Sequence, residues 1–281
     1  MNENPVLVIG GTGKTGRRVV RQLTERGIPV RSASRKGETR FDWLDETTWG
    51  PALEGVSGVY IVQNDTAPRT RELTEHAARA GVRRLVLLSA RGVDTPGYYG
   101  EDPSTSDAFL AGEAAVRESG LAWTILRPGW FAQNFDEGFF NEGVLAGELR
   151  LPAGDGVATW IDVEDIAAVA VAALTEDGHD GQIYELSGPR PVALDEALSL
   201  IAAAGGRKAV YSALTVEEFV AELVAQGVSA PDASLWAAAL NPVASGGEAK
   251  VSDGVRRALG RDARDFADFV KGAAAAGAWR A

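Results

Sequence analysis

A glycine-rich segment follows a short apolar run near the start of the chain, and its spacing has a clear chemical meaning. Gly10, Gly13 and Gly16 fit the pattern G-x-x-G-x-x-G, and Gly11, Gly13 and Gly16 also fit G-x-G-x-x-G. Glycines at this spacing let a strand turn sharply into a helix and let the backbone approach a pyrophosphate, whose charge the helix N-terminus stabilises. The segment therefore predicts a dinucleotide-binding turn rather than an ordinary glycine turn.

Gly13-Lys14-Thr15 is similar to the end of a P-loop, which is a rival interpretation of the same segment. The P-loop motif requires a further glycine five positions before Gly13. Val8 occupies that position in this chain. We therefore predict that the segment does not bind ATP in the manner of a Walker motif.

Two cations follow the second apolar run of the chain. Residues 29–33 read as a strand, and Ser34, Arg35 and Lys36 come directly after it. NAD-specific sites usually carry Asp or Glu here to bind the ribose 2′-hydroxyl, whereas a guanidinium can pair with a 2′-phosphate through two hydrogen bonds. The cations predict a preference for NADPH over NADH. The alternative is that they are solvated loop charges.

These residues need a scaffold of alternating strands and helices, and the first 126 residues carry that pattern. Short apolar runs alternate with segments that have apolar residues at three- and four-residue spacing. The rhythm predicts right-handed βαβ units and a parallel sheet. The predicted strands are 6–9, 29–33, 40–42, 58–62, 84–88 and 122–126, and the predicted helices are 14–26, 47–53, 69–80 and 104–119.

After residue 127 the alternation weakens, and we predict a second lobe. Further predicted strands are 147–151, 157–160 and 182–186, and further predicted helices are 162–175, 194–204, 215–226, 232–240 and a last one from 264 onward. The predicted fold is α/β: a Rossmann-type, doubly wound parallel sheet in residues 1–187 and a smaller, mostly helical substrate lobe in 188–281. Segments near 128–160 should line the cleft between them, because ligands of such sheets lie beyond the carboxyl ends of the strands.

Composition argues against several other classes of function. The 281 residues are 45% hydrophobic and 24% charged, and the net charge of −11 disfavours nucleic acid as a partner. The chain has no cysteine and only two histidines, so we expect neither thiol chemistry nor a metal site. We see no leader segment and no apolar run long enough to span a membrane, and we expect a soluble, cytoplasmic protein.

Several further motifs occur in a fixed order along the chain. They are Gly-Gly-Thr-Gly-Lys-Thr-Gly at 10–16, Ala-Ser-Arg at 33–35, Val-Leu-Leu-Ser-Ala at 86–90 and Leu-Arg-Pro-Gly-Trp-Phe-Ala-Gln-Asn-Phe at 126–135. Together they resemble an NmrA-like atypical short-chain dehydrogenase/reductase. Phe-Asp-Trp-Leu-Asp at 41–45, Asp-Val-Glu-Asp-Ile at 162–166 and Gly-Pro at 188–189 are similar to the ergot-alkaloid branch, which makes agroclavine- and festuclavine-type products. The resemblance implies the fold, NADPH as cofactor and reduction of an iminium.

The resemblance also implies roles for individual residues. It implies that the pyrophosphate is bound by Gly10, Thr12, Gly13, Lys14, Thr15 and Gly16. The other implied positions are Arg35 and Lys36 at the 2′-phosphate, Asp42 and Trp43 beside the adenine, Gln63 and Asn64 near the ribose, Ser89 facing the nicotinamide, and Pro128, Gly129, Trp130 and Phe131 bordering nicotinamide and substrate.

The catalytic pair of the larger dehydrogenase superfamily is missing. That pair is Tyr-x-x-x-Lys, in which the lysine lowers the pKa of the tyrosine. Tyr98 and Tyr99 are each followed four residues later by a residue other than lysine, and no lysine lies between Lys36 and Lys208. Related phenylpropanoid reductases carry a lysine at a position that falls near Phe109. An iminium accepts hydride without a proton donor, so orientation and a carboxylate or aromatic face can suffice.

We predict Tyr99 and Ser89 as catalytic residues, because Tyr99 lies in a loop where an acid would be useful. The alternative for the tyrosine is packing in a surface loop. The predicted substrate pocket consists of Tyr98, Trp130, Phe131, Asn134 and Phe135, whose aromatic members could instead be core. Further acidic residues could balance a cationic ligand, either Asp136 and Glu137 or the loop residues Glu101, Asp102 and Asp107.

The expected function is an NADPH-dependent reductase of a small hydrophobic or aromatic molecule with an electrophilic C=N or C=C bond. Two alternatives stay open: a quinone reductase of the same family, and a non-catalytic NADP(H) sensor that contacts a partner protein. The missing catalytic pair is compatible with the sensor. The aromatic residues at 130–135 and the helical lobe favour the enzyme, because they would enclose a small-molecule substrate.

Overall fold

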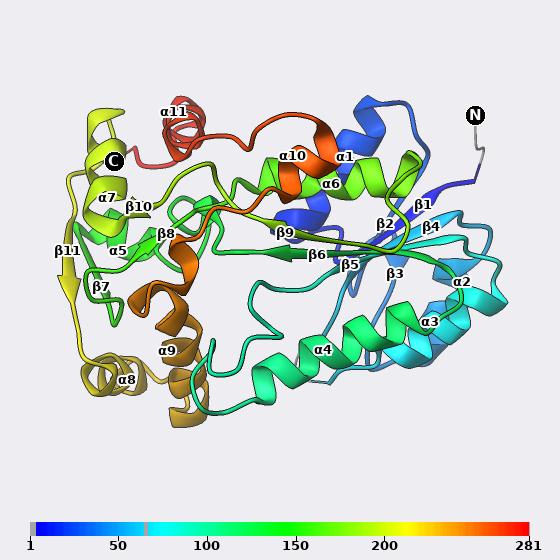
Figure 1. Ribbon diagram of the computed structural model, residues 1–281, viewed down its shortest axis with the longest axis horizontal. Helices are drawn as coiled ribbons and strands as arrows, with labels where there is room; N and C mark the ends of the chain where they lie inside the picture. Colours follow the sequence, from blue (N-terminus) through cyan, green and yellow to red (C-terminus); the bar gives the residue numbers. More distant parts are fainter. Residues whose placement is uncertain (1–3, 65–66, 281) are drawn as a thin grey trace.

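A seven-stranded parallel β-sheet dominates the computed structural model, which describes residues 4–64 and 67–280 (Figure 1). The strand order is β3-β2-β1-β4-β5-β6-β9, and every neighbouring pair is parallel. The order reverses between β1 and β4, which is the switch point of a doubly wound sheet. The strands are β1 (Val6–Ile9), β2 (Val30–Ser34), β3 (Thr39–Arg40), β4 (Gly58–Val62), β5 (Arg84–Leu88), β6 (Ala122–Pro128) and β9 (Gln182–Leu186).

Helices cover both faces of this sheet because its strands are apolar on both sides. In β1, Val6 and Val8 pack with α1 and α6, whereas Leu7 and Ile9 pack with α2 and α3. Figure 1 shows α1, α6 and α10 above the sheet, and α3 and α4 below it. The helices are α1 (Lys14–Glu25), α2 (Trp49–Leu53) after the short turn η1 (Glu46–Thr48), α3 (Thr70–Arg79), α4 (Ser104–Arg117), α6 (Val163–Thr175) and α10 (Gly254–Leu259).

Residues 132–160 and 192–279 share a second hydrophobic core, which includes the buried rings of Phe140, Trp160 and Trp279. Two small sheets border it: β7 (Glu148–Leu151) is parallel to β11 (Val210–Ala213), and β8 (Val157–Ala158) is antiparallel to β10 (Val192–Ala193). The other elements are α5 (Asn141–Ala146), α7 (Leu194–Ala203), α8 (Val216–Ala225), α9 (Ala230–Ala244), α11 (Phe266–Ala276), η2 (Ala132–Asn134) and η3 (Gly247–Ala249).

The division into lobes at residues 187 and 188 stays a prediction, and two segments pack across it. Helix α10 lies in the second range but packs against α6 and β9 of the large sheet. Residues 132–160 lie in the first range but pack with the C-terminal helices. Both packings join segments that are far apart in the sequence, so no local pattern indicates them.

The predicted doubly wound α/β fold is confirmed, with a strand at every predicted place, although the strands predicted at 147–151 and 157–160 form β7 and β8 of the two small sheets. Helix α9 is longer than the predicted 232–240, because Ser229 caps it two residues before Pro231 and the helix continues through Pro242. The sequence patterns did not predict α5, α10 or β11. These elements are short, and β11 owes its form to its partner β7, which is distant in the sequence.

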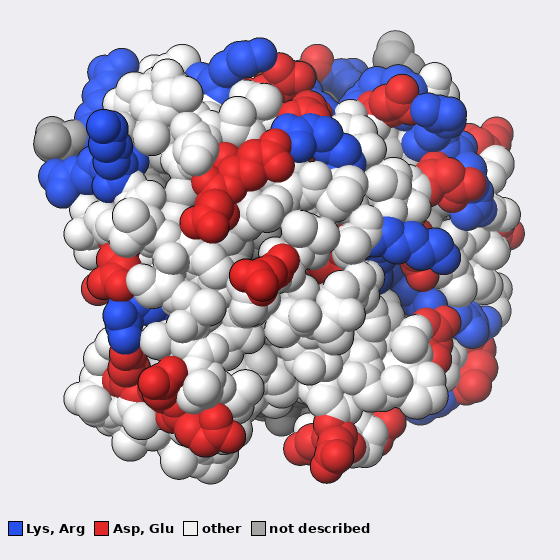
Figure 2. All heavy atoms as spheres, turned by 60° about the vertical axis from the view of Figure 1, so that its left-hand side comes forward, with Lys and Arg blue, Asp and Glu red and all other residues white. Residues whose placement is uncertain are grey.

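Charged side chains are unevenly spread over the face shown in Figure 2. Asp and Glu are scattered over a largely uncharged centre, and Lys and Arg gather toward the edges. This face has no continuous basic stripe of the kind that nucleic-acid-binding proteins present, in keeping with the net charge of −11. Within the described ranges, no helix combines the length and the apolarity that a membrane span requires.

Candidate functional site

The glycine-rich segment forms the turn from β1 into α1 at the switch point of the sheet. Gly10 has a φ of 74°, a conformation that favours glycine, and Gly13 is the N-cap residue of α1. Gly16 packs so closely on this turn that a Cβ atom there would lie 2.2 Å from the carbonyl oxygen of Gly10. The first turn of α1 has no acidic residue, so its N-terminal dipole is not offset by a carboxylate. This geometry suits a pyrophosphate.

Arg35 and Lys36, predicted to bind a 2′-phosphate, lie beside this turn. They follow β2, which is the neighbour of β1 in the sheet, and both side chains are exposed. Neither side chain is held by core packing, so each can rotate toward a ligand at the carboxyl edge of the sheet. The position is compatible with the predicted role.

Asp42 and Trp43 are fixed by contacts of their own. The carboxylate of Asp42 accepts a hydrogen bond from the backbone N–H of Leu44 at 3.0 Å, which is a local turn contact. The indole Nε1 of Trp43 donates to the carbonyl oxygen of Val62 at 3.2 Å, and the ring packs edge-on against Phe41 with centroids 5.3 Å apart. The bond to Val62 holds Trp43 at the carboxyl end of β4, where a role beside the cofactor requires it.

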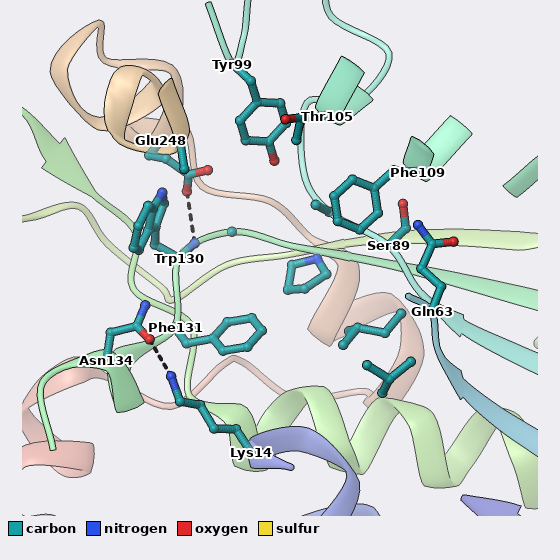
Figure 3. A pocket seen from close by; sticks show the side chains of 16 residues that line it. Lys14, Gln63, Ser89, Tyr99, Thr105, Phe109, Trp130, Phe131, Asn134 and Glu248 are labelled. Carbon is teal, nitrogen blue, oxygen red and sulfur yellow. Dashed lines mark hydrogen bonds between the residues drawn. The ribbon is translucent and has the colours of Figure 1, made fainter. Parts of the chain in front are cut away.

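A cavity of about 370 Å³ lies at the carboxyl ends of β4, β5 and β6 (Figure 3). It brings together nine of the predicted site residues: Lys14, Gln63, Ser89, Tyr99, Pro128, Gly129, Trp130, Phe131 and Asn134. The predicted residues that do not line it are Gly10, Thr12, Gly13, Thr15, Gly16, Arg35, Lys36, Asp42, Trp43, Asn64, Tyr98 and Phe135. The glycine turn and the cations that follow β2 thus lie at the same edge of the sheet but outside the cavity wall.

Seven residues of the wall were not predicted as site residues, and four of them, Val62, Leu88, Ala90 and Ala239, are apolar. Thr105 and Phe109 come from α4, and Glu248 comes from η3 in the C-terminal lobe. The resemblance placed the lysine of related reductases near Phe109, and the cavity has the aromatic ring of Phe109 in its wall. Glu248 could not be found from the sequence, because it lies far along the chain from the motifs and has no motif of its own.

Ser89 is hydrogen-bonded to a buried ion pair. Its Oγ donates to Oε1 of Glu113 at 2.7 Å, and Arg127 donates to both oxygens of the same carboxylate at 2.7 and 2.8 Å. Glu113 is 1% exposed, and its hydrogen bonds raise the pKa of Arg127. Because the hydroxyl hydrogen of Ser89 is donated to Glu113, the oxygen of Ser89 is left to accept a hydrogen bond from a molecule in the cavity.

Tyr98 and Tyr99 direct their hydroxyl hydrogens into the protein. Tyr99 donates to the carbonyl oxygen of Arg91 at 2.7 Å, and Tyr98 donates to Oε1 of Glu248 at 2.6 Å. Burial first, and then the charge of Glu248, raise the pKa of both phenols. Neutral phenols whose hydrogens are already donated are poor proton donors to a ligand. The ring of Tyr99 lines the cavity, and that of Tyr98 packs edge-on behind it.

The segment after β6 closes over the first turn of α1. Nζ of Lys14 donates to Oδ1 of Asn134 at 2.9 Å, and both residues line the cavity. Glu137 pairs with two arginines of α1, including Arg18 at 2.8 Å. These arginines already balance the charge of Glu137, so this residue is poorly suited to balance a cationic ligand, which is the role considered for it above. Burial raises the pKa of Asp136 to about 6, which reduces its charge near neutral pH.

Phe135, predicted to line the substrate pocket, lies in the second hydrophobic core instead. It is fully buried, and its ring contacts Phe140, Trp160 and Phe266 with centroids 5.1, 5.1 and 5.2 Å apart. The chain turns through η2 at this point, so successive side chains point in different directions. Trp130 faces the cavity and stacks on Phe140 with centroids 5.4 Å apart, so the aromatic cluster supports the cavity wall from behind.

Both histidines have partners outside the cavity. His76 lies 2.9 Å from Oε1 of Glu46, and Nδ1 of His179 lies 3.0 Å from the hydroxyl of Tyr184. Among residues 4–64 and 67–280, no group of three or more His, Asp or Glu side chains is placed to hold a metal ion.

Comparison with known proteins gives three findings that bear on the site. A family profile described as NAD(P)H-binding matches residues 10–177. The chain is 35% identical to an NAD(P)H azoreductase of Xenophilus azovorans, over 96% of this chain and 98% of that protein, and 32% identical to an agroclavine dehydrogenase of Claviceps fusiformis, over 94% and 96%. The crystal structure of the NADPH complex of quinone oxidoreductase QOR2 from Escherichia coli superimposes with a TM-score of 0.80 at 24% identity, over 95% and 99% of the two chains, and shows the same fold.

Proposed function

Because the chain belongs to the NAD(P)H-binding family, we propose that it is an NADPH-dependent reductase of a small hydrophobic or aromatic electrophile with a C=N or activated C=C bond. The chain is an NAD(P)H-dependent oxidoreductase, and the predicted resemblance to the agroclavine dehydrogenase branch is confirmed. The cavity beside the glycine turn carries the finer proposal, because its wall is aromatic and its two predicted catalytic hydroxyls donate their hydrogens into the protein.

The cofactor would lie along the carboxyl edge of the sheet. The tight turn at Gly10, Gly13 and Gly16 supports a pyrophosphate site, because only a backbone without Cβ atoms leaves this approach open. Nearby side chains would complete it: Thr12, Lys14 and Thr15 at the pyrophosphate, Arg35 and Lys36 at the 2′-phosphate, Asp42 and Trp43 near the adenine, Gln63 and Asn64 near the ribose, and Ser89 and Pro128 near the nicotinamide.

When bound, NADPH supplies a hydride and is oxidised to NADP⁺. An iminium carbon accepts the hydride while the π electrons of its C=N bond become the lone pair of the amine nitrogen, so no proton is required. The residues of the cavity would orient the electrophile and exclude water. Ser89 would accept a hydrogen bond from the nicotinamide amide, since its own hydrogen is bound to Glu113.

Arg35→Ala is expected to weaken NADPH binding by ~10- to 100-fold, because charge-assisted hydrogen bonds to a phosphate contribute about 1.5–3 kcal/mol. NADH has no 2′-phosphate, so its dissociation constant should change by less than ~2-fold. Titrations followed by nicotinamide fluorescence measure both constants. Arg79→Ala serves as the control, because it removes the same charge from the C-terminal end of α3. Equal affinity of the wild-type protein for NADPH and NADH would remove Arg35 from this role.

Tyr99→Phe is expected to retain at least a third of the wild-type kcat. The ring stays in the cavity wall, and the lost hydroxyl is bound to the carbonyl oxygen of Arg91 rather than offered to the substrate. If Tyr99 were the general acid, its loss would cost ~10²- to 10⁴-fold. Steady-state rates with an imine substrate distinguish the two results, and a loss in that larger range would restore Tyr99 as the catalytic acid.

The proposed function is tested by NADPH consumption against a panel of imines, enones and quinones. Turnover of an imine or enone supports the proposal, and turnover of quinones alone supports the alternative of a quinone reductase. A protein that binds NADPH and NADP⁺ tightly but reduces no member of the panel would be an NADP(H) sensor. A cytoplasmic location and small molecules as the only ligands stay predictions.

A further inference from the structure

Glu248 places a carboxylate in the wall of the cavity (Figure 3). The residue is 2% exposed. Its Oε1 accepts the hydroxyl hydrogen of Tyr98 at 2.6 Å, and its Oε2 accepts a long hydrogen bond from the backbone N–H of Trp130 at 3.4 Å. Burial removes water from the charge, which costs free energy unless hydrogen bonds and a counter-charge replace the water. Two hydrogen bonds leave further accepting capacity, since a carboxylate has about four lone-pair sites.

Arg91 supplies only part of the counter-charge. Its nearest nitrogen lies 3.7 Å from Oε2 of Glu248, which is beyond hydrogen-bond distance. Its own hydrogen bonds go to the carbonyl oxygen of Lys250 at 2.7 Å and to Oγ1 of Thr159 at 3.2 Å, and a second carboxylate, that of Glu185, lies 3.9 Å away. Arg91 does not line the cavity, whereas Glu248 does. A cation in the cavity would therefore contact the carboxylate of Glu248 and not the guanidinium of Arg91.

Aromatic rings accompany the carboxylate. Trp130 and Tyr99 line the cavity together with Glu248. Figure 3 shows Trp130 below the carboxylate and Tyr99 above it and to its right. The faces of Trp and Tyr rings attract cations, and cages of such rings bind alkylated ammonium groups. Stacking on Phe140 holds the indole of Trp130 in place, so a ligand would not have to order it.

The carboxylate of Glu248 occupies space that is free because residue 129 is a glycine. A Cβ atom at this position would lie 2.4 Å from Oε2 of Glu248, so any larger residue would push the carboxylate away. Figure 3 shows Lys14, the first residue of α1, at the opposite end of the cavity. The two ends of the cavity thus carry groups of opposite charge, which would orient a charged ligand.

We propose that Glu248, Trp130 and Tyr99 form a subsite for a cationic, alkylated nitrogen, and that the enzyme therefore selects electrophiles that carry a permanent positive charge. The inference rests on the proposed function, since it names the charge of the substrate that the same cavity would reduce. A cationic ligand completes the compensation that Arg91 provides only in part, and it gains the attraction of two aromatic rings.

The probe is a pair of molecules that differ only in charge. 4-(Hydroxymethyl)-N,N,N-trimethylanilinium has a quaternary nitrogen where 4-tert-butylbenzyl alcohol has a carbon. Isothermal titration calorimetry gives their affinities for the NADP⁺-loaded protein. We expect wild type to bind the cation at least ~10-fold more tightly than the neutral molecule, a difference of about 1.4 kcal/mol. Glu248→Gln keeps an acceptor for Tyr98 and should lower this ratio below ~3-fold.

Glu217→Gln is the matched control, because it removes the same charge from an exposed residue in the first turn of α8. The wild-type ratio should persist in this variant. A ratio near one in wild type, or an unchanged ratio in Glu248→Gln, overturns the subsite. If Glu248→Gln does not bind NADP⁺, the same titrations are made with Trp130→Leu. This substitution keeps apolar bulk but removes the aromatic face, so it is expected to lower the ratio of the two affinities as well.

Turnover separates this inference from the proposed function. N-methyl-3,4-dihydroisoquinolinium, a permanent iminium cation, is compared with a neutral aromatic enone in wild type and Glu248→Gln. The substitution should lower kcat/KM for the cation at least ~10-fold more than it lowers kcat/KM for the enone. Reduction of neither compound by wild type refutes the proposed function. Reduction of both, with equal losses in the variant, refutes the subsite alone.

Discussion

Gly16→Ala is expected to raise the dissociation constants for NADPH and NADH together by at least ~100-fold, equivalent to about 3 kcal/mol. The added Cβ would lie 2.2 Å from the carbonyl oxygen of Gly10 and 2.9 Å from Cα of Gly11. These are backbone atoms, so they can yield only by opening the turn that would cradle the pyrophosphate. Titration by nicotinamide fluorescence measures both constants, and thermal unfolding without ligand shows whether the fold survives.

Gly272→Ala is the control for this substitution. Gly272 lies in α11, and a Cβ atom there would meet no atom within 4 Å. Alanine should stabilise that helix by about 0.5–1 kcal/mol and leave cofactor binding unchanged. If Gly16→Ala bound both dinucleotides as tightly as wild type, the turn would not be the pyrophosphate site.

Glu113→Gln is expected to lower the free energy of unfolding by about 3–5 kcal/mol, because it removes the buried carboxylate that pairs with Arg127 and leaves this guanidinium only Asp94, whose side chain is 55% exposed. Glu113 is 1% exposed, accepts from Arg127 at 2.7 and 2.8 Å, and accepts from Ser89 at 2.7 Å. The amide group of glutamine would also point N–H donors at the guanidinium. Urea unfolding of the protein without ligand measures the loss.

The control for this prediction is Glu118→Gln, at the C-terminal end of the same helix. Glu118 pairs with Arg71 at 2.8 Å, but both side chains are more than half exposed, so the loss should stay below about 1 kcal/mol. Losses of equal size in the two variants would show that the ion pair of Glu113 contributes no more than a surface pair.

Local sequence patterns predicted the large sheet because its signals are local. The run before Gly10 is apolar on every residue, as a strand covered on both faces requires, and glycines end the helices between the strands. The loops of parallel strands meet at one edge, so the sequence also brought Lys14, Ser89 and Trp130 to one cavity. The same reasoning failed for Phe135, because the single 3-10 turn η2 that it follows is too short for a period to show in the sequence.

The sequence by itself determined the doubly wound sheet, the glycine turn and the class of cofactor, since each depends on residues that are neighbours along the chain. Only the tertiary structure decided which polar groups reach the ligand. It directed the hydrogens of Ser89 and Tyr99 into the protein, and it brought Glu248 from the C-terminal lobe into the cavity. Such contacts depend on packing between distant segments, and the charge of the cavity follows from that packing rather than from any motif.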